Sequence, residues 1–392
     1  MSRREPGAAM HGARSGADAR RPGVAGIAVI AVLVSSTAVV ALGGSALVGP
    51  RSDPDDTRRV GSEGRAAAKR FLDQYLDADG RVVRRDQGGD SVSEGQAYAM
   101  LLAQAVGDRR RFDLAWQWAR RNLQRADSLL AWRWADGKVV DPMPAADADL
   151  DAAWALVLAA AQFDDDSLRH EGLRMAGAVL DHETVGLGGA VTEDLLLVAG
   201  PWARESRMVN PSYLSPGALV AMAGETDDPR WPALAVTGRR LLSRLVGPDR
   251  PLPPDWSRLS ATGALEPVPA PGTEAEGPRY GLDAARLLPR LAPCAGAWQS
   301  VAATSWPVLA KAAGTASAMA TDLTGSPVHS GPHPAKSVGA AAAAHAAGDH
   351  RARDRLLSEA EGLQRSSPTY YGAAWVAMGR LLLESSLGGP CA

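Results

Sequence analysis

Carboxyl side chains stand at the beginning of three apolar, helix-like segments of this sequence. Glu94 lies in the run SEGQAYAMLL, Asp147 begins DADLDAAWAL, and Asp283 lies in LDAAR. A positioned carboxyl group can donate a proton to a reacting atom or accept one from it. If the three helix starts meet in one cleft, they would form a catalytic centre built from acids.

Two interpretations of Glu94 compete. The spacing from Ser91 to Glu94 fits a capping box, in which the serine and glutamate side chains bind each other's free backbone N–H groups. The adjacent Gly95 would permit close approach of a ligand or of a neighbouring backbone. Burial of Glu94 among Tyr98 and tryptophan side chains would raise its pKa by removing the carboxyl from water.

The D-x-D-x-D spacing of Asp147, Asp149 and Asp151 is similar to that of a calcium-binding loop. Ala152 stands where such a loop needs glycine and Leu158 where it needs a bidentate glutamate, so we exclude calcium. Helix capping would explain one of the three aspartates. Because carboxylates this close repel one another, we expect an arginine or a substrate hydroxyl to hold at least one.

Asp283 is followed three positions later by Arg286. An exposed helical ion pair at this spacing contributes only ~0.2–0.5 kcal/mol. In the functional interpretation, Arg286 keeps Asp283 ionised, as a base must be at neutral pH. The sequence has no H-E-x-x-H, no clustered Cys/His set and no G-x-S-x-G, which argues against zinc proteases and serine hydrolases. We therefore predict neither a metal nor an organic cofactor.

The composition indicates an ordinary globular protein with no nucleic-acid partner. The net charge of the 392 residues is -2, and tryptophan (11) outnumbers phenylalanine (3). The tryptophan ring can stack on a sugar as well as fill a core. Cys294 and Cys391 are too few for a disulfide framework. One bridge tying the tail to the body of an exported domain and two free thiols are equal alternatives.

The N-terminal part of the chain predicts export. No charged residue occurs from Pro22 to Pro50, and Val24 to Leu42 is about as long as a bilayer-spanning helix. Gly44 to Ala46 would suit a cleavage site, but the apolar run exceeds the ~7–15 residues of a cleaved signal, which favours an uncleaved anchor. The rest of the chain would lie outside the bacterial cytoplasm, membrane-anchored or secreted. The predicted parts are an Arg-rich cytoplasmic N-terminus (1–22), an anchor or signal (23–50), a linker (51–62) and a catalytic domain (63–392).

Beyond the linker, apolar residues recur with a helical period. About twelve helices suit six helical hairpins closed into a ring, which would bury every apolar face. Gly186 to Val198 is the best candidate for a short β-hairpin, and the Pro- and Gly-rich residues 247–279 predict a long loop of functional importance. The predicted helices are 62–76, 91–106, 109–125, 149–163, 167–180, 212–224, 229–246, 281–291, 299–318, 335–347, 351–364 and 370–386.

The acidic motifs resemble those of glycoside hydrolase family 8, which includes the endoglucanases that accompany bacterial cellulose synthases. The resemblance runs in family order over nearly the whole predicted catalytic domain. Its segments are Ser93–Leu102 (family S-E-G-x-x-Y-G-M-L), Phe112–Trp118 (F-D-x-x-W-x-W), Ala145–Phe163 (A-S/T-D-A/G-D-x-x-I/M-A), Asn210–Pro216 (D-P-S-Y-F-x-P), Leu282–Arg286 (Y-D-A-A-R) and Tyr370–Gly372 (Y-Y-D/S).

This resemblance implies an all-α (α/α)6 barrel and inverting, endo-acting hydrolysis of a β-1,4-linked glycan, with cellulose or a related glucan first. Glu94 falls on the family's general acid, Asp283 on its catalytic base and Asp147 on the aspartate that braces the distorted sugar. Inversion requires the acid and base to lie about 6.5–9.5 Å apart. We expect a monomer whose partners are the polysaccharide and, through the N-terminal segment, the membrane. Predicted substrate contacts are Tyr98, Trp132, Trp134, Asp149 (also the fallback for Asp147), Tyr213 and Arg286.

Several positions depart from the family pattern. Leu282 replaces the tyrosine before the base and removes a hydroxyl, while Asn210 replaces an aspartate and Ala99, Ala146 and Ala152 replace other signature residues. Leu282 favours one alternative, a catalytically weak or inactive glycan-binding protein of the same fold. A polysaccharide lyase is the other, and it would need a cationic cleft and a Tyr, His or Lys proton acceptor. Cellulose, mixed-linkage glucan, chitosan and xylan all remain open as the glycan.

Overall fold

The computed structural model describes residues 61–188, 194–312, 318–385 and 391, and these are mostly helical. The α-helices of this part are α1 (Ser62–Tyr75), α2 (Ser93–Ala105), α3 (Arg109–Asn122), α4 (Ala146–Phe163), α5 (Asp166–His182), α6 (Pro216–Glu225), α7 (Arg230–Leu245), α8 (Leu282–Leu291), α9 (Ala297–Thr304), α10 (Trp306–Ala312), α11 (Pro334–Ala346), α12 (His350–Ser366) and α13 (Tyr370–Glu384).

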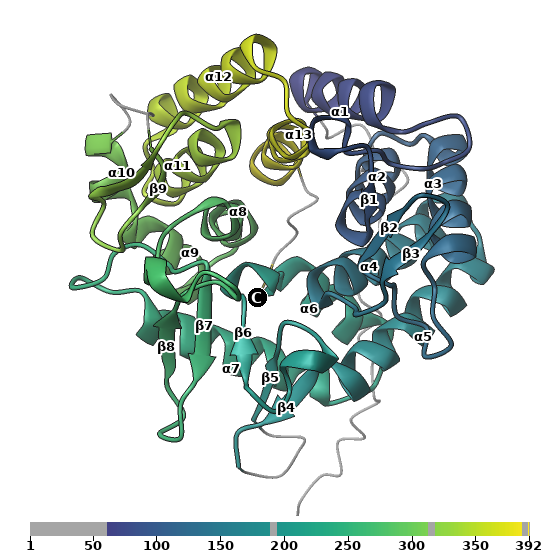
Figure 1. The fold of residues 1–392 in the computed structure, drawn as a ribbon, viewed down its shortest axis with the longest axis horizontal. Helices are drawn as coiled ribbons and strands as arrows, with labels where there is room; N and C mark the ends of the chain where they lie inside the picture. Colours follow the sequence, from purple (N-terminus) through teal and green to yellow (C-terminus); the bar gives the residue numbers. More distant parts are fainter. Residues whose placement is uncertain (1–60, 189–193, 313–317, 386–390, 392) are drawn as a thin grey trace, which may run out of the picture. The chain divides into compact units, whose positions relative to one another are not determined.

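Six of these helices form a closed inner ring (Figure 1). In order around the ring, each of α2, α4, α6, α8, α11 and α13 packs against the next, and α13 packs against α2. Each inner helix also packs against an outer one, for example α4 against α5 and α11 against α12. This pairing is consistent with the predicted (α/α)6 barrel.

The composition of the helices explains which ones lie inside. Helix α11 is rich in alanine and is buried from Pro334 to Ala344, whereas the outer helix α12 buries only Ala352, Leu356, Leu357 and Ala360. A helix that is apolar all round has to be enclosed on all sides, whereas one apolar stripe suits a position facing solvent. Small side chains also let neighbouring inner helices approach closely.

Short antiparallel sheets join the helices. The pairing of β4 with β5 confirms the hairpin predicted for Gly186 to Val198, although its first strand begins two residues earlier, at Thr184. One three-stranded sheet consists of β1 (Ser91–Val92), β2 (Arg133–Ala135) and β3 (Lys138–Asp141), and another of β6 (Met208–Val209), β7 (Trp256–Leu259) and β8 (Leu265–Val268). Two further sheets have two strands each: β4 (Thr184–Gly186) with β5 (Leu195–Leu197), and β9 (Ala318–Thr321) with β10 (Pro327–Ser330).

Two predictions about secondary structure are wrong. The predicted helix 299–318 is divided into α9 and α10 and is followed by β9, because Pro307 has no N–H to continue the helix across Ser305. The predicted loop 247–279 contains the hairpin β7–β8, whose turn uses Gly263 at φ +77°. The other predicted helices are confirmed with small shifts at their ends, such as α6 beginning at Pro216.

The predicted membrane anchor and nearly all of the linker fall outside the described residues. Among the described residues, no helix combines the length and apolarity needed to cross a membrane.

A disulfide joins Cys294, beyond the end of α8, to Cys391 in the C-terminal tail, with the two Cα atoms 4.9 Å apart. Of the two alternatives that the sequence left open, the structure therefore has the bridge.

Replacing Cys294 and Cys391 together by serine should lower the free energy of unfolding by about 2–4 kcal/mol, because the bridge restricts the unfolded chain over a separation of 97 residues. Urea unfolding of the parent and the double variant, each with and without reductant, measures this. Reductant should destabilise only the parent. Equal unfolding midpoints for the parent and the double variant would contradict the prediction.

Candidate active site

Arg286 of α8 brings together the helix starts on which the predicted acids stand. Its guanidinium is buried, and Nη1 lies 2.7 Å from Oδ2 of Asp147 at the start of α4. Nη1 also donates to the hydroxyl of Tyr98 (2.8 Å) on α2, the helix that carries Glu94. Nη2 lies 3.5 Å from Oδ1 of Asp283. The N-terminal halves of α2, α4 and α8 therefore meet around one cation.

Glu94 does not take part in a capping box. Ser91 lies in β1, paired with Trp134 of β2, and its hydroxyl donates to the carbonyl of Val82 instead. Helix α2 begins at Ser93 and no side chain caps it. The capping interpretation is wrong because the chain before the helix is already held as a strand.

The environment of Glu94 favours its protonated form. Oε2 is inaccessible to solvent and has no hydrogen-bond partner in the described part of the chain. Burial, and after it the negative charge of Asp147, raises the pKa of Glu94 to about 7, although Arg286 acts in the opposite direction. The close approach that Gly95 permits is to the Tyr370 hydroxyl, which would lie 2.7 Å from a Cβ at this position. A carboxyl that keeps its proton near neutral pH can act as an acid.

The three aspartates of α4 are buried, and each has a separate partner. Asp147 pairs with Arg286, Oδ1 of Asp149 accepts from the backbone N–H of Leu130 (2.7 Å), and Asp151 makes two hydrogen bonds with Arg290 (2.8 and 2.5 Å). None of them caps α4, whose cap residue is Ala145, so the capping interpretation is wrong here too. The expectation that an arginine holds at least one is confirmed.

No group of three or more acidic, histidine or cysteine side chains among the described residues is arranged to hold a metal ion.

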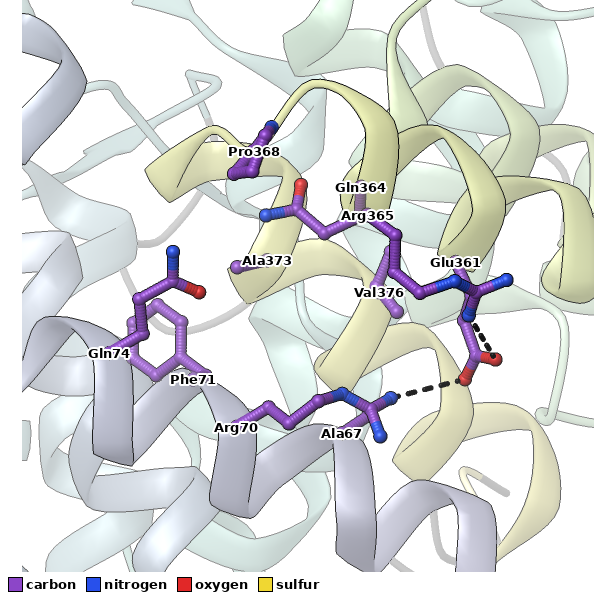
Figure 2. A pocket seen from close by; sticks show the side chains of 10 residues that line it. All are labelled: Ala67, Arg70, Phe71, Gln74, Glu361, Gln364, Arg365, Pro368, Ala373 and Val376. Atoms are coloured by element: carbon purple, nitrogen blue, oxygen red, sulfur yellow. Dashed lines mark hydrogen bonds and ion pairs between the residues drawn. The ribbon is translucent and has the colours of Figure 1, made fainter.

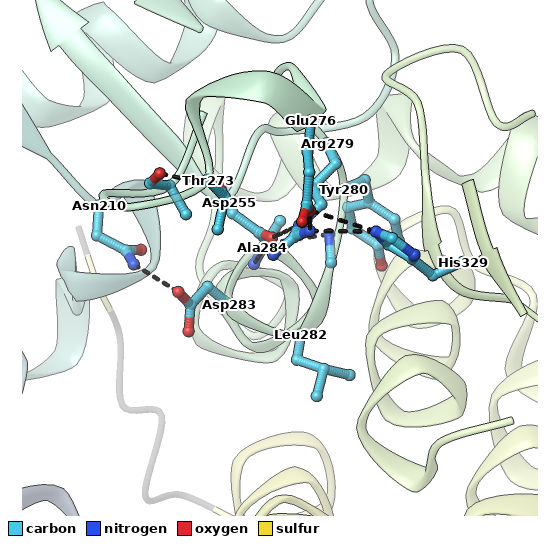
Figure 3. Close-up of polar contacts among 12 residues, drawn as sticks. Asn210, Asp255, Thr273, Glu276, Arg279, Tyr280, Leu282, Asp283, Ala284 and His329 are labelled. Carbon is cyan, nitrogen blue, oxygen red and sulfur yellow. Dashed lines mark hydrogen bonds and ion pairs between the residues drawn. The ribbon is translucent and has the colours of Figure 1, made fainter. Parts of the chain in front are cut away.

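Asp283 is more accessible than the aspartates of α4. Its side chain is 34% exposed, against 2% for Asp147, and its Oδ2 accepts from Nδ2 of Asn210 at 2.9 Å (Figure 3). The partner Arg286 is only 3% exposed, so this contact is not the solvent-exposed helical pair weighed from the sequence. Asp283 can reach water while two fixed groups hold its carboxylate.

A line of aromatic rings leads away from Arg286 towards the surface. Tyr213 packs under the guanidinium, with Cζ 5.1 Å from its ring centre. Trp256 of β7 contacts Tyr213 (6.3 Å between ring centres) and Trp202 (6.2 Å), and Trp202 is 40% exposed. Sequence reasoning missed both tryptophans. The only signal for them in the sequence was the high tryptophan content. Trp256 was also hidden in a segment predicted to be a loop.

The two other predicted tryptophans are placed differently. The carbonyl of Trp132 accepts from the backbone N–H of Ser93 (2.9 Å), so this half-buried residue lies beside the start of α2. Trp134 packs edge-on against Trp118 of α3 (5.4 Å), with the Arg81 guanidinium over its ring at 4.3 Å. The Trp134 ring thus packs against other side chains of the protein. A contact between Trp134 and substrate stays a prediction.

A separate pocket lies between α1 and the pair α12 and α13 (Figure 2). Its floor is apolar, its rim includes an Arg70–Glu361 ion pair (3.4 Å), and none of the predicted site residues line it. Its lining residues are Ala67, Arg70, Phe71, Gln74, Glu361, Gln364, Arg365, Pro368, Ala373 and Val376.

Comparison with known proteins identifies the family. Residues 61–384 match the family described as "Glycosyl hydrolases family 8". A "Probable endoglucanase" of Novacetimonas hansenii is 37% identical over 226 residues, covering 55% of this chain and 63% of that protein. An "Endoglucanase" of Cellulomonas uda is 31% identical over 227 residues, covering 56% and 61%. The match thus spans less than two thirds of either relative's length.

The solved structures agree with this match. The endo-beta-1,4-glucanase CMCax from Acetobacter xylinum superposes with a TM-score of 0.66 at 27% identity, covering 84% of this chain and 98% of that one. The family match covers most of the chain, and it agrees with the ring of paired helices and with the order of the acidic motifs. The chain belongs to family 8 of the glycosyl hydrolases.

Proposed function

We propose that this protein hydrolyses a β-1,4-linked glucan by an inverting, endo-acting mechanism. The observation that carries the proposal is the pairing of two unlike carboxyls around Arg286. Glu94 has a half-buried side chain with one carboxyl oxygen inaccessible to solvent and a pKa of about 7, and Asp283 is accessible and held by polar contacts. A carboxyl that keeps its proton suits the role of acid, and an accessible carboxylate held by polar contacts suits the role of base. The two relatives are named "Probable endoglucanase" and "Endoglucanase", which supports a glucan substrate.

In the proposed reaction, Glu94 donates its proton to the glycosidic oxygen as the bond to the anomeric carbon breaks. A water molecule attacks that carbon from the opposite face, and Asp283 takes its proton. The product therefore has inverted configuration, and Glu94 and Asp283 return to their starting states by proton exchange with solvent. The mechanism requires their carboxyls to lie about 6.5–9.5 Å apart, which leaves room for the water.

The neighbouring residues have supporting roles in this proposal. Asp147 accepts a hydrogen bond from a sugar hydroxyl and favours the oxocarbenium-like state. Asn210 donates to Oδ2 of Asp283 and thereby sets the orientation of the carboxylate. Stacking of sugar rings on Tyr213, Trp256 and Trp202 would hold the glycan in line with the acids.

The alternatives receive less support. A lyase needs a cationic cleft, whereas Arg286 is already paired with Asp147 and Asp283. Leu282 still favours a glycan-binding protein without turnover, because it lacks the hydroxyl of the family's tyrosine.

The proposed location is outside the cytoplasm, with the N-terminal segment as an uncleaved anchor or a signal. The Cys294–Cys391 bridge supports this, because such bridges persist in oxidising compartments. Membrane fractionation and N-terminal sequencing of the protein from its native host test it. Recovery in the cytosol would contradict it.

A panel of β-1,4 glycans tests the function, with cellulose derivatives, mixed-linkage glucan, chitosan and xylan as substrates. Reducing ends should appear together with a rapid fall in viscosity, and proton NMR should show the α-anomer first. Ultraviolet absorption by an unsaturated product would indicate a lyase. Oligosaccharide binding without turnover would indicate the binding protein.

Glu94→Gln and Asp283→Asn should each lower kcat by about 10²–10⁴-fold, because each removes a proton-transfer group. Assays on the best substrate of the panel measure this, with Asp354→Asn on the exposed face of α12 as the control. Thermal unfolding should show that all three variants remain folded. Retained activity in either acid variant would refute the role of that residue.

The pH dependence should report Glu94. Activity, as kcat/KM, should fall as the pH rises above about 7, where Glu94 loses its proton. Its pKa in the folded protein lies above the ordinary 4.5, so ionisation of Glu94 destabilises the folded state as the pH rises from about 4.5 through 7. The stability of Glu94→Gln relative to the parent should therefore increase over that range. Urea unfolding at the two ends measures it, and a difference of opposite sign would contradict the assignment.

A further inference from the structure

The start of α8, which carries Asp283, is held by a carboxylate from outside the helix. Oδ1 of Asp255 accepts from the backbone N–H groups of Gly281 (2.9 Å) and Ala284 (2.8 Å), and Figure 3 shows the contact with Ala284 beside Asp283. The first N–H groups of a helix have no partner within it. Gly281, the cap residue, has no side chain to supply one. Asp255 supplies the missing acceptor from the residue before β7.

Only glycine fits at position 281 beside the Asp255 carboxylate, for a steric reason. Its φ of -109° is available to any residue, but a Cβ there would collide with Oδ2 of Asp255. The glycine thus lets a buried carboxylate approach the backbone from the side.

The chain immediately before α8 is fixed as well. Tyr280 pairs with Thr321 of β9 through backbone hydrogen bonds in both directions (2.9 and 3.1 Å). Its carbonyl also accepts from Nζ of Lys336 (2.8 Å), and this ammonium lies 3.5 Å from the centre of the Tyr280 ring. The backbone is therefore held on both sides of the Asp283 side chain.

Charged groups from three directions face Asp255. Nε of Arg279 lies 3.4 Å from Oδ2, and Lys336 of α11 and Asp283 of α8 act on it through their charges. Around Arg279 lie Glu276, which pairs with it, and His329 of β10, whose Nε2 is 3.3 Å away. Burial and then the charge of Asp283 raise the pKa of Asp255 to about 6.

We propose that Asp255 is a positioning residue for the base: by binding the N–H groups on either side of Asp283, it aims that carboxylate at the attacking water. The side chain of Asp255 is 8% exposed and acts through the backbone, so it needs no contact with substrate. This inference rests on the proposed function and adds to it a residue that determines catalytic rate. A displacement of about 1 Å in a reacting group can lower the rate about 10²-fold.

Three variants test the proposal, assayed on a soluble β-1,4 glucan well below their unfolding temperatures. Asp255→Ala removes the acceptor and should lower kcat about 10–100-fold while KM changes less than about twofold. Gly281→Ala displaces the same carboxylate and should reproduce that loss. Asp255→Asn keeps an oxygen for both N–H groups and should recover kcat to within about threefold of the parent.

The matched control is Asp108→Ala, which removes the carboxylate that caps α3 by accepting from the N–H of Arg111 (3.0 Å). It should lower the unfolding temperature and leave kcat unchanged. Parental kcat in Asp255→Ala overturns the proposal; if that variant does not fold, parental kcat in Gly281→Ala does so. An Asp255→Asn variant as slow as Gly281→Ala also overturns it. Hydrolysis by the parent separates these outcomes from failure of the proposed function, and an inactive parent overturns both.

Discussion

The site depends on the contacts of one buried cation, the guanidinium of Arg286. A charge removed from water is tolerated only when partners surround it. Asp147 and Asp283 supply opposite charge, and the hydroxyls of Tyr98 and Ser212 accept two of its N–H groups (2.8 and 2.9 Å). Because these partners come from α2, α4, α8 and the turn before α6, displacement of any one element would leave the cation unsatisfied.

The same arrangement recurs one helical turn deeper. Asp151 follows Asp147 by four residues on α4, and Arg290 follows Arg286 by four on α8, and the second pair is again buried. Residues four apart lie on the same face of a helix, so the two ion pairs set the register of α4 against α8. Since α4 carries Asp147 and α8 carries Asp283, this register also places Asp147 relative to Asp283.

The sequence predicted the helices well, and it predicted that the acidic helix starts meet, but it predicted most partners of the acidic side chains poorly. Helical periodicity marked the inner ring because alanine-rich segments leave little ambiguity, and the carboxyls stood at recognisable helix starts. Local patterns misled at Glu94, where the S-x-x-E spacing suggested a capping box that the pairing of β1 with β2 prevents. The contacts of Asp283 with Asn210, and of Asp151 with Arg290, join positions 73 and 139 residues apart, which no local pattern can show.

Some missed features had a local signal. The turn between β2 and β3 is Asp136-Gly137, with both residues at positive φ, and this dipeptide is a strong hairpin signal. The segment 247–279 had none, because β7 (Trp256–Leu259) does not alternate apolar with polar residues and β8 contains Pro267.

Segment 247–279 lies between the aromatic rings proposed to bind sugar and the helix that carries the proposed base. Asp255 and Trp256 are neighbours at the beginning of β7, and successive side chains of an extended chain point in opposite directions. Asp255 faces the first turn of α8, whereas Trp256 contacts Tyr213 and Trp202. One rigid strand end thus spaces the aromatic rings proposed to bind sugar from the backbone that carries the proposed base. A hairpin can maintain that spacing and a flexible loop cannot, which gives a physical reason for β-structure at this point in a helical fold.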